Sequence, residues 1–101
     1  MFLPTKNALK RAIALSLTGT RGGLVRLKII IMLEKSPQNI NQISKRLCMD
    51  YKTIQHHIRV LEKSGLIKSS SYSYNNSYAL STLLMSNKDT LKELCKLGKS
   101  R

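Results

Sequence analysis

Acidic side chains are scarce in this sequence, and their scarcity sets the charge of the whole chain. Five Asp and Glu stand against eighteen Lys and Arg, which leaves a formal net charge of +13 at pH 7. The acids are scattered, no nucleophile has a credible base partner, and no phosphate-binding glycine loop follows a strand, so we expect no enzyme. A positive potential attracts polyanions; nucleic acid is therefore the expected partner, and an anionic membrane surface is the lesser alternative.

Cysteine is also rare. Cys48 and Cys95 are too few for a disulfide framework and are not spaced as a metal pair, so we expect thiols. A disulfide stays open as the alternative if the source is a hyperthermophile. The adjacent His56 and His57 would point about 100° apart on a helix, which rules out an i, i+4 ligand pair. We therefore expect no metal and no other cofactor.

Long apolar runs are missing as well. None reaches the ~18 residues that a membrane-spanning helix needs. Lys10 and Arg11 cut into the apolar part of an N-terminal stretch that mildly imitates a signal peptide. We expect a cytoplasmic protein with no membrane partner. A chain of 101 residues is long enough for one domain with a modest core.

Two short helices separated by a three-residue turn are predicted between Ile40 and Leu66. The first helix opens on Asn41, and Asp50 is the expected N-cap of the second. Gly65 supplies the left-handed residue that ends the second helix. The residues that recur at helical spacing and must face the core are Ile54, Ile58 and Leu61. This pattern is a helix-turn-helix.

The opposite face of the second helix carries cationic and amide side chains. Arg can bind guanine bidentately, Gln can do the same for adenine, and Lys can contact phosphates. A solvated basic face is the alternative, but the helix and turn before it favour nucleic-acid contact. His57 is expected at the rim of the core. The predicted DNA-contacting residues of this helix are Tyr51, Lys52, Thr53, Gln55, His56, Arg59 and Lys63.

The run from Thr20 to Leu66 resembles the winged helix-turn-helix domains of archaeal transcriptional regulators, of the arsenical-repressor-like superfamily. The matching segments are TRGG before a helix, NINQI at the next helix, and DYKTIQHHIRVLEKSGLI across the third helix and into the wing. The resemblance implies that the third helix enters the major groove and that the protein is a dimer. Cys48 stands where related sequences commonly carry Gly, and a left-handed backbone there would cost roughly 1 kcal/mol.

A β-hairpin, the wing, is predicted after Leu66, with Asn75-Asn76 as a two-residue turn. In that register Ser71 opposes Leu80, Ser73 opposes Tyr78 and Tyr74 opposes Ser77; Ile67, Tyr78 and Leu80 share the inner face. Ile40 is expected to be a one-residue first strand of this sheet. The predicted wing contacts with DNA are Lys68, Ser70, Tyr72, Tyr74, Asn75 and Asn76. The predicted contacts with the DNA backbone are Arg21, Arg26 and Lys45.

Three further helices are predicted. KNALKRAIALSL reads as an amphipathic helix of about three turns, whose apolar side can pack on its own domain, on a second subunit or, as the lesser alternative, on a lipid surface. LVRLKIIIMLEK is apolar around most of its circumference and fits a central helix. A last helix covers Ser81 to Leu97, either continuous or restarted at Asn87. Because no strand remains to cover its leucines, we expect them to pair with a two-fold mate. The predicted dimer interface is Leu9, Ile13, Leu17, Leu84, Leu91, Leu94 and Leu97.

The expected fold is therefore α+β and mostly helical: a three-helix core with a small antiparallel wing and helical extensions at both ends. Residues 1–20 form an N-terminal helix, 21–80 the winged-helix domain, and 81–101 a C-terminal dimerisation helix. We expect a sequence-specific double-stranded DNA-binding transcriptional regulator that acts as a homodimer, with no small-molecule effector evident. The alternative is a winged-helix module for protein or RNA contacts with only non-specific DNA affinity.

Overall fold

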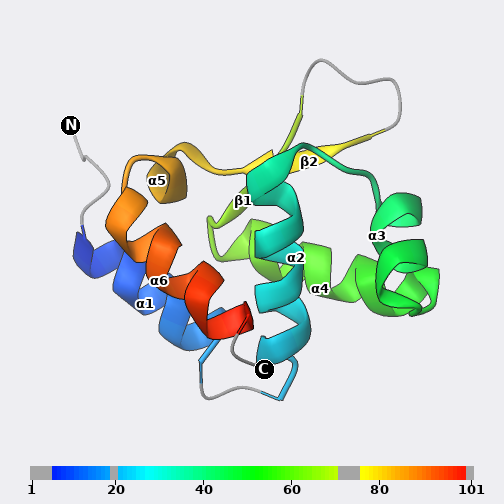
Figure 1. Cartoon of the computed structure of the whole chain (residues 1–101), viewed down its shortest axis with the longest axis horizontal. Coiled ribbons are helices and arrows are strands. Elements are labelled where there is room, and N and C mark those ends of the chain that lie inside the picture. Colours follow the sequence, from blue (N-terminus) through cyan, green and yellow to red (C-terminus); the bar gives the residue numbers. More distant parts are fainter. Residues whose placement is uncertain (1–5, 19–20, 71–75, 100–101) are drawn as a thin grey trace.

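The computed structural model describes residues 6–18, 21–70 and 76–99, and this part of the chain is mostly helical with one small sheet (Figure 1). In chain order the elements are α1 (Lys6–Ser16), α2 (Gly23–Lys35), α3 (Ile40–Leu47), α4 (Tyr51–Lys63), β1 (Ile67–Ser69), β2 (Tyr78–Leu80), α5 (Thr82–Met85) and α6 (Lys88–Lys99). The two strands pair antiparallel. The predicted class, a helical core with a small wing and a helix at each end, is confirmed.

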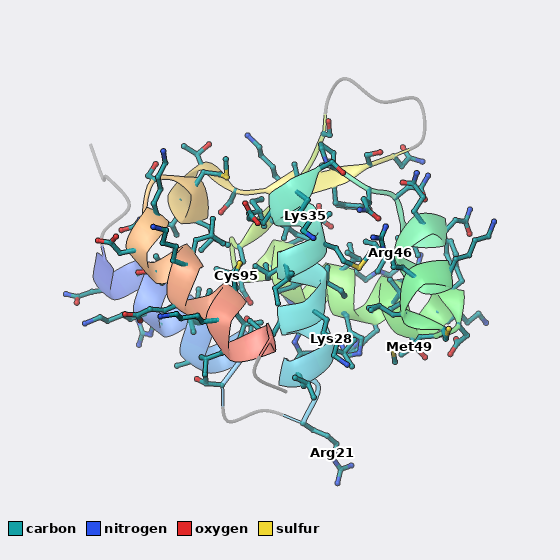
Figure 2. All side chains as sticks on the ribbon, in the orientation of Figure 1. Arg21, Lys28, Lys35, Arg46, Met49 and Cys95 are labelled. Atoms are coloured by element: carbon teal, nitrogen blue, oxygen red, sulfur yellow. The ribbon has the colours of Figure 1, made fainter. Side chains whose placement is uncertain are left out.

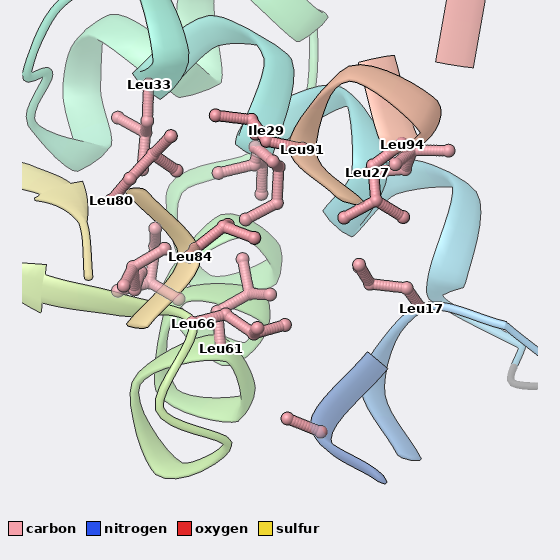
Figure 3. Packing of buried hydrophobic residues seen from close by; sticks show 14 of the residues in the cluster. Leu17, Leu27, Ile29, Leu33, Leu61, Leu66, Leu80, Leu84, Leu91 and Leu94 are labelled. Atoms are coloured by element: carbon pink, nitrogen blue, oxygen red, sulfur yellow. The ribbon is translucent and has the colours of Figure 1, made fainter. Parts of the chain in front are cut away.

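The core forms around α2, which runs through the centre of the molecule (Figure 1). Because this helix is apolar on nearly every side, it can pack on α4, α6 and β2 at once. Its buried side chains include Leu27, Ile29, Ile30 and Leu33. Figure 3 shows several of them among leucines from α4, β2, α5 and α6. Each fully buried leucine or isoleucine contributes roughly 1.5–3 kcal/mol. The predicted central helix is confirmed.

The leucines of the terminal helices lie inside one chain, and the prediction that they form a surface between subunits is wrong for most of them. Leu9, Leu17, Leu84, Leu91 and Leu94 are all at most 9% exposed. Leu97 is 50% exposed, and Ile13 is half-buried. The reason is that α6 packs on α2. The all-round apolar surface of α2 covers the leucine side of α6, so no second copy is needed to bury it.

The C-terminal helix is interrupted, as one of the two predicted arrangements required. Ser81 caps the short helix α5, with its hydroxyl accepting from the N–H of Leu84 at 3.2 Å. The chain then restarts after Asn87, whose carbonyl accepts from the N–H of Leu91 at 3.0 Å. The restart sets the direction of α6 and so directs its leucines toward α2.

The predicted register of the wing is wrong by four residues. Ile67 pairs with Leu80 and Ser69 pairs with Tyr78. Ser70 extends the pairing with an N–H bond to the carbonyl of Ser77 at 2.7 Å. The predicted two-residue turn at Asn75-Asn76 includes Asn75, which lies outside the described residues. A shift by an even number of residues keeps every side chain on its face of the sheet. Ile67 and Leu80 therefore still face the core together, as expected.

The segment between α2 and α3 also differs from the prediction. Gln38, not Ile40, forms the isolated bridge to Tyr78, with backbone bonds of 3.1 and 2.8 Å. Ile40 is the first residue of α3, and Asn39, not Asn41, is its N-cap. The Asn39 side chain accepts from the N–H of Gln42 at 2.8 Å, and the Gln42 side chain accepts from the N–H of Asn39 at 2.9 Å. This capping box satisfies two exposed backbone donors and so sets where α3 begins.

Candidate nucleic-acid interface

The turn between α3 and α4 is held by its local sequence. Cys48 ends α3 in the left-handed conformation, with φ 54°. Asp50 then caps α4: its carboxylate accepts from the Thr53 hydroxyl at 2.6 Å and from the Thr53 N–H at 3.2 Å. These hydrogen bonds, the hydroxyl first, lower the pKa of Asp50, so it is ionised at the positive end of the helix at neutral pH. The predicted N-cap and the predicted start of α4 are confirmed.

The helix α4 has an apolar side and a polar side. Ile54, Ile58 and Leu61 are at most 1% exposed and face the core, as predicted. Gly65, with φ 81°, follows the helix as its left-handed stop. The predicted contact residues lie on the surface: Tyr51, Lys52, His56, Arg59 and Lys63 are exposed, and Thr53 and Gln55 are half-buried. All seven side chains are thus at least partly accessible, with the Thr53 hydroxyl engaged by Asp50, and their contact with DNA stays a prediction.

The wing adds a second polar surface. Lys68 and Asn76 are exposed, and Ser70 is half-buried. Asn76 has φ 52°, a left-handed conformation that asparagine tolerates better than most residues. The predicted contacts at Tyr72, Tyr74 and Asn75 lie outside the described residues.

A polar recess of about 380 Å³ joins α4 to the wing. Its lining includes Asn39 and Asn41 from α3 and its cap, Gln55 from α4, and Asn76 and Tyr78 from the wing. None of the residues that line it is charged, so it offers amide and hydroxyl groups that can donate to phosphates and can donate to or accept from base edges. Burial raises the pKa of Tyr78, so its hydroxyl is a neutral donor at neutral pH. Asn39, Asn41 and Tyr78 were not among the predicted contacts. The sequence gives no signal for the bridge between Gln38 and Tyr78, which brings Tyr78 close to the residues before α3.

The three residues that were predicted to contact the DNA backbone differ in their exposure. Arg21 and Lys45 are exposed, and Figure 2 shows Arg21 projecting away from the body of the molecule. Arg26 is only 6% exposed, so the prediction that it contacts DNA is wrong. Its Nε donates to the Ser16 carbonyl at 2.6 Å, and its Nη1 donates to Nδ1 of His57 at 2.9 Å. Arg26 lies on a side of α2 that other helices cover, so it is buried and held by hydrogen bonds, whereas Lys28 and Lys35 on the same helix are exposed.

His57 lies at the edge of the core, as predicted, and is 7% exposed. Burial first, and then the charges of Arg26 and His56, lower its pKa. His56, its neighbour, is exposed on the polar side of α4.

Within residues 6–18, 21–70 and 76–99, no group of three or more His, Cys, Asp or Glu side chains could hold a metal ion. None of the helices described is long and apolar enough to cross a membrane.

Fold and surface together define a winged helix-turn-helix. Residues 25–69, somewhat less than half of the chain, match the family described as bacterial regulatory protein, arsR family. This segment is therefore similar to the arsR family, which supports the arsenical-repressor-like resemblance. The matching family is described as bacterial, so archaeal origin gains no support from it.

Solved structures extend the similarity over nearly the whole chain. HlyU from Vibrio cholerae N16961 is 24% identical, with a TM-score of 0.67 over 91% of this chain and 95% of that one. BigR from Xylella fastidiosa, a transcriptional repressor, is 16% identical, with a TM-score of 0.57 over 93% and 75%. Mb0332 from Mycobacterium bovis is 17% identical, with a TM-score of 0.59 over 99% and 86%; it is described as a homodimeric winged helix-turn-helix DNA-binding domain. No curated protein sequence matches the chain. At these identities the shared property is the fold.

Proposed function

We propose that this protein is a sequence-specific double-stranded DNA-binding regulator that inserts α4 into the major groove. The observation that carries the proposal is the exposed face of α4, where Lys52, His56 and Arg59 lie opposite the buried isoleucines. A helix of this kind, preceded by a capped turn and followed by a wing, has the inventory that base edges and phosphates require.

The side chains divide by chemistry. Arg59 is suited to guanine and Gln55 to adenine, because each can form two hydrogen bonds to one base edge. Lys52 and Lys63 are suited to phosphates, which set register and carry no sequence information. Lys68 and the uncharged recess beside Gln55 would meet the backbone or the minor groove next to the major-groove contacts. We propose no catalytic activity for this protein. We expect it to act in the cytoplasm.

A homodimer completes the proposal, because two copies of α4 would then meet successive major grooves on a palindromic site. The homodimeric domain Mb0332 shares this fold, which supports the assignment. The leucines inside the chain cannot serve as the interface. Leu97, at 50% exposed, and the half-buried Ile13 are the members of the predicted interface that are left for a second copy.

The test uses a duplex recovered by genome-wide footprinting and a scrambled duplex of the same length. Fluorescence anisotropy at fixed salt should show at least ~10³-fold tighter binding to the recovered site. Gln55→Ala should reduce this preference at one base position by about 1–3 kcal/mol. Lys92→Ala, which removes an exposed charge from α6, is the matched control and should keep the preference. Weak binding that is equal for both duplexes would indicate the protein- or RNA-interaction module instead.

A further inference from the structure

A buried polar cluster joins three helices on the side of α4 that faces away from the proposed DNA surface. It consists of Ser16 at the end of α1, Arg26 on α2, and His57 and Ser64 at α4 and its C-cap. Ser16 is 0% exposed, Arg26 6% and His57 7%. In a core made mostly of leucine and isoleucine, such a group is costly unless its members are hydrogen-bonded to one another.

The members of the cluster are bonded in a chain from α1 to α4. Arg26 donates from Nε to the Ser16 carbonyl at 2.6 Å and from Nη1 to Nδ1 of His57 at 2.9 Å. The Ser64 hydroxyl donates to the Val60 carbonyl at 2.8 Å, so the hydroxyl of Ser16 is the donor in the Ser16–Ser64 bond. Both connections tie the end of α1 to α4, one through Arg26 and one directly.

The chemistry of Arg26 determines the protonation state of His57. A guanidinium has only donors and stays charged, so Nδ1 of His57 must carry a lone pair. The ring is then neutral, with its proton on Nε2. A second proton would have to go to Nδ1, where it would face the N–H of Arg26 and put two positive charges in the same buried cluster.

Within residues 6–18, 21–70 and 76–99, no carboxylate acts on His57 to offset that charge. Among the described residues, the charged or titratable groups that act on His57 are Arg26 from α2 and His56 from α4 itself, and both oppose protonation. The residues that the cluster contributes from α1 and the C-cap of α4 are serines. Burial is the largest influence and acts in the same direction, so the pKa of His57 lies below its ordinary value of 6.5.

Gly22 shows how closely the pair is packed. A Cβ at this position would lie 2.6 Å from Nη1 of Arg26 and 2.7 Å from Cε1 of His57. The backbone of Gly22 has φ −90°, which any residue adopts. Glycine is favoured here because a larger residue would not fit, and not because of the backbone conformation. Gly22, the first glycine of the TRGG segment, thus has a structural use: it lets the chain pass over the Arg26–His57 contact.

We propose that Arg26 and His57 are positioning residues for the recognition helix α4, and that protonation of His57 breaks their contact and weakens DNA binding on acidification. The proposal rests on the proposed function. His57 lies two residues from both Gln55 and Arg59, so a force on its ring acts directly on the segment of α4 that carries the base-reading side chains. Loss of a fixed orientation before binding costs affinity, because the complex must then order the helix.

The experiment compares wild type with His57→Asn, whose side-chain oxygen can accept from Arg26 near the Nδ1 position but cannot be protonated. Dissociation constants for one duplex are measured at fixed ionic strength at about pH 7.5 and about pH 4.5, the second well below the ordinary histidine pKa because the pKa of His57 is lowered. The exposed His56 is present in both proteins, so its effect on DNA binding cancels in the comparison. We expect acidification to weaken binding by wild type at least about threefold more than binding by His57→Asn.

Equal ratios for the two proteins would overturn the positioning role while leaving the proposed function intact. Absence of duplex binding by wild type at both pH values would overturn the proposed function and the pH response together. Nitrogen NMR of wild-type histidines gives a second measurement that needs no variant. At about pH 7.5 we expect His57 as the neutral Nε2–H tautomer, and a ring protonated on Nδ1 would contradict the contact on which the proposal depends.

Discussion

Single residues hold the turn before α4, and one of them does so under strain. Cys48 has φ 54°, a region that residues with a Cβ enter at a cost. Its thiol makes only a long contact, 3.9 Å, with the Lys45 carbonyl. The turn therefore needs the backbone conformation at this position and has little use for the side chain.

Replacing Cys48 with Gly should raise the free energy of unfolding by roughly 1 kcal/mol, because glycine adopts this conformation without the steric penalty. Urea denaturation under reducing conditions measures the change. Cys48→Ala is the matched control: it removes the thiol but keeps the Cβ, and should leave stability nearly unchanged. A gain for alanine as large as that for glycine would assign the effect to the thiol instead.

At this scale, the role of a residue can be predicted from sequence where its partners lie within its own turn of chain. Asp50 was predictable as a cap because its partner, Thr53, is three residues away. Arg26 was not, because the groups that hold it, the Ser16 carbonyl and the His57 ring, come from two other helices. A lone arginine in an apolar helix has the same pattern whether it reaches solvent or is buried with a partner.

Among the elements, the helix α4 was predictable almost completely and the wing only in part. The apolar spacing of α4, its N-cap and its glycine stop are all local, so they set its limits and its faces. The register of the wing depends on which backbone groups meet across the hairpin. Alternation in the sequence determines which face a side chain takes, and it is satisfied equally by registers that differ by an even number of residues.

We predict that α4, not the wing, makes the larger contribution to DNA affinity. Arg59→Ala should weaken binding to the recovered site by about 1–3 kcal/mol and relax specificity at one base pair. Lys68→Ala removes a charge from the wing; it should cost less and act alike on all sequences, lowering the salt slope by about 1. Anisotropy titrations at several salt concentrations separate the two effects. The reverse ranking would mean that the wing leads recognition.

For the molecule as a whole, the sequence could not show what covers an apolar face. The leucine spacing of α6 is correct as a pattern, but the same pattern serves packing within one chain and packing between two. The structure brings α6 onto α2, which buries Leu91 and Leu94 and leaves Leu97 at 50% exposed. Residues of one predicted leucine stripe therefore have different roles: some pack in the core, and Leu97 is exposed for a second copy. Substitutions at these positions can distinguish the two roles.

Light scattering at micromolar concentration should give a mass near twice the 11.4 kDa of one chain. Leu97→Glu should shift the protein to the monomer while its helical circular dichroism stays unchanged, because this side chain is exposed within one chain and a buried unpaired charge costs a dimer several kcal/mol. Leu94→Glu, one turn earlier and 4% exposed, should instead lose the folded signal, because the charge would enter the core beside α2. A dimer that survives Leu97→Glu would locate the interface elsewhere, and a monomeric wild type would remove the two-fold arrangement on DNA altogether.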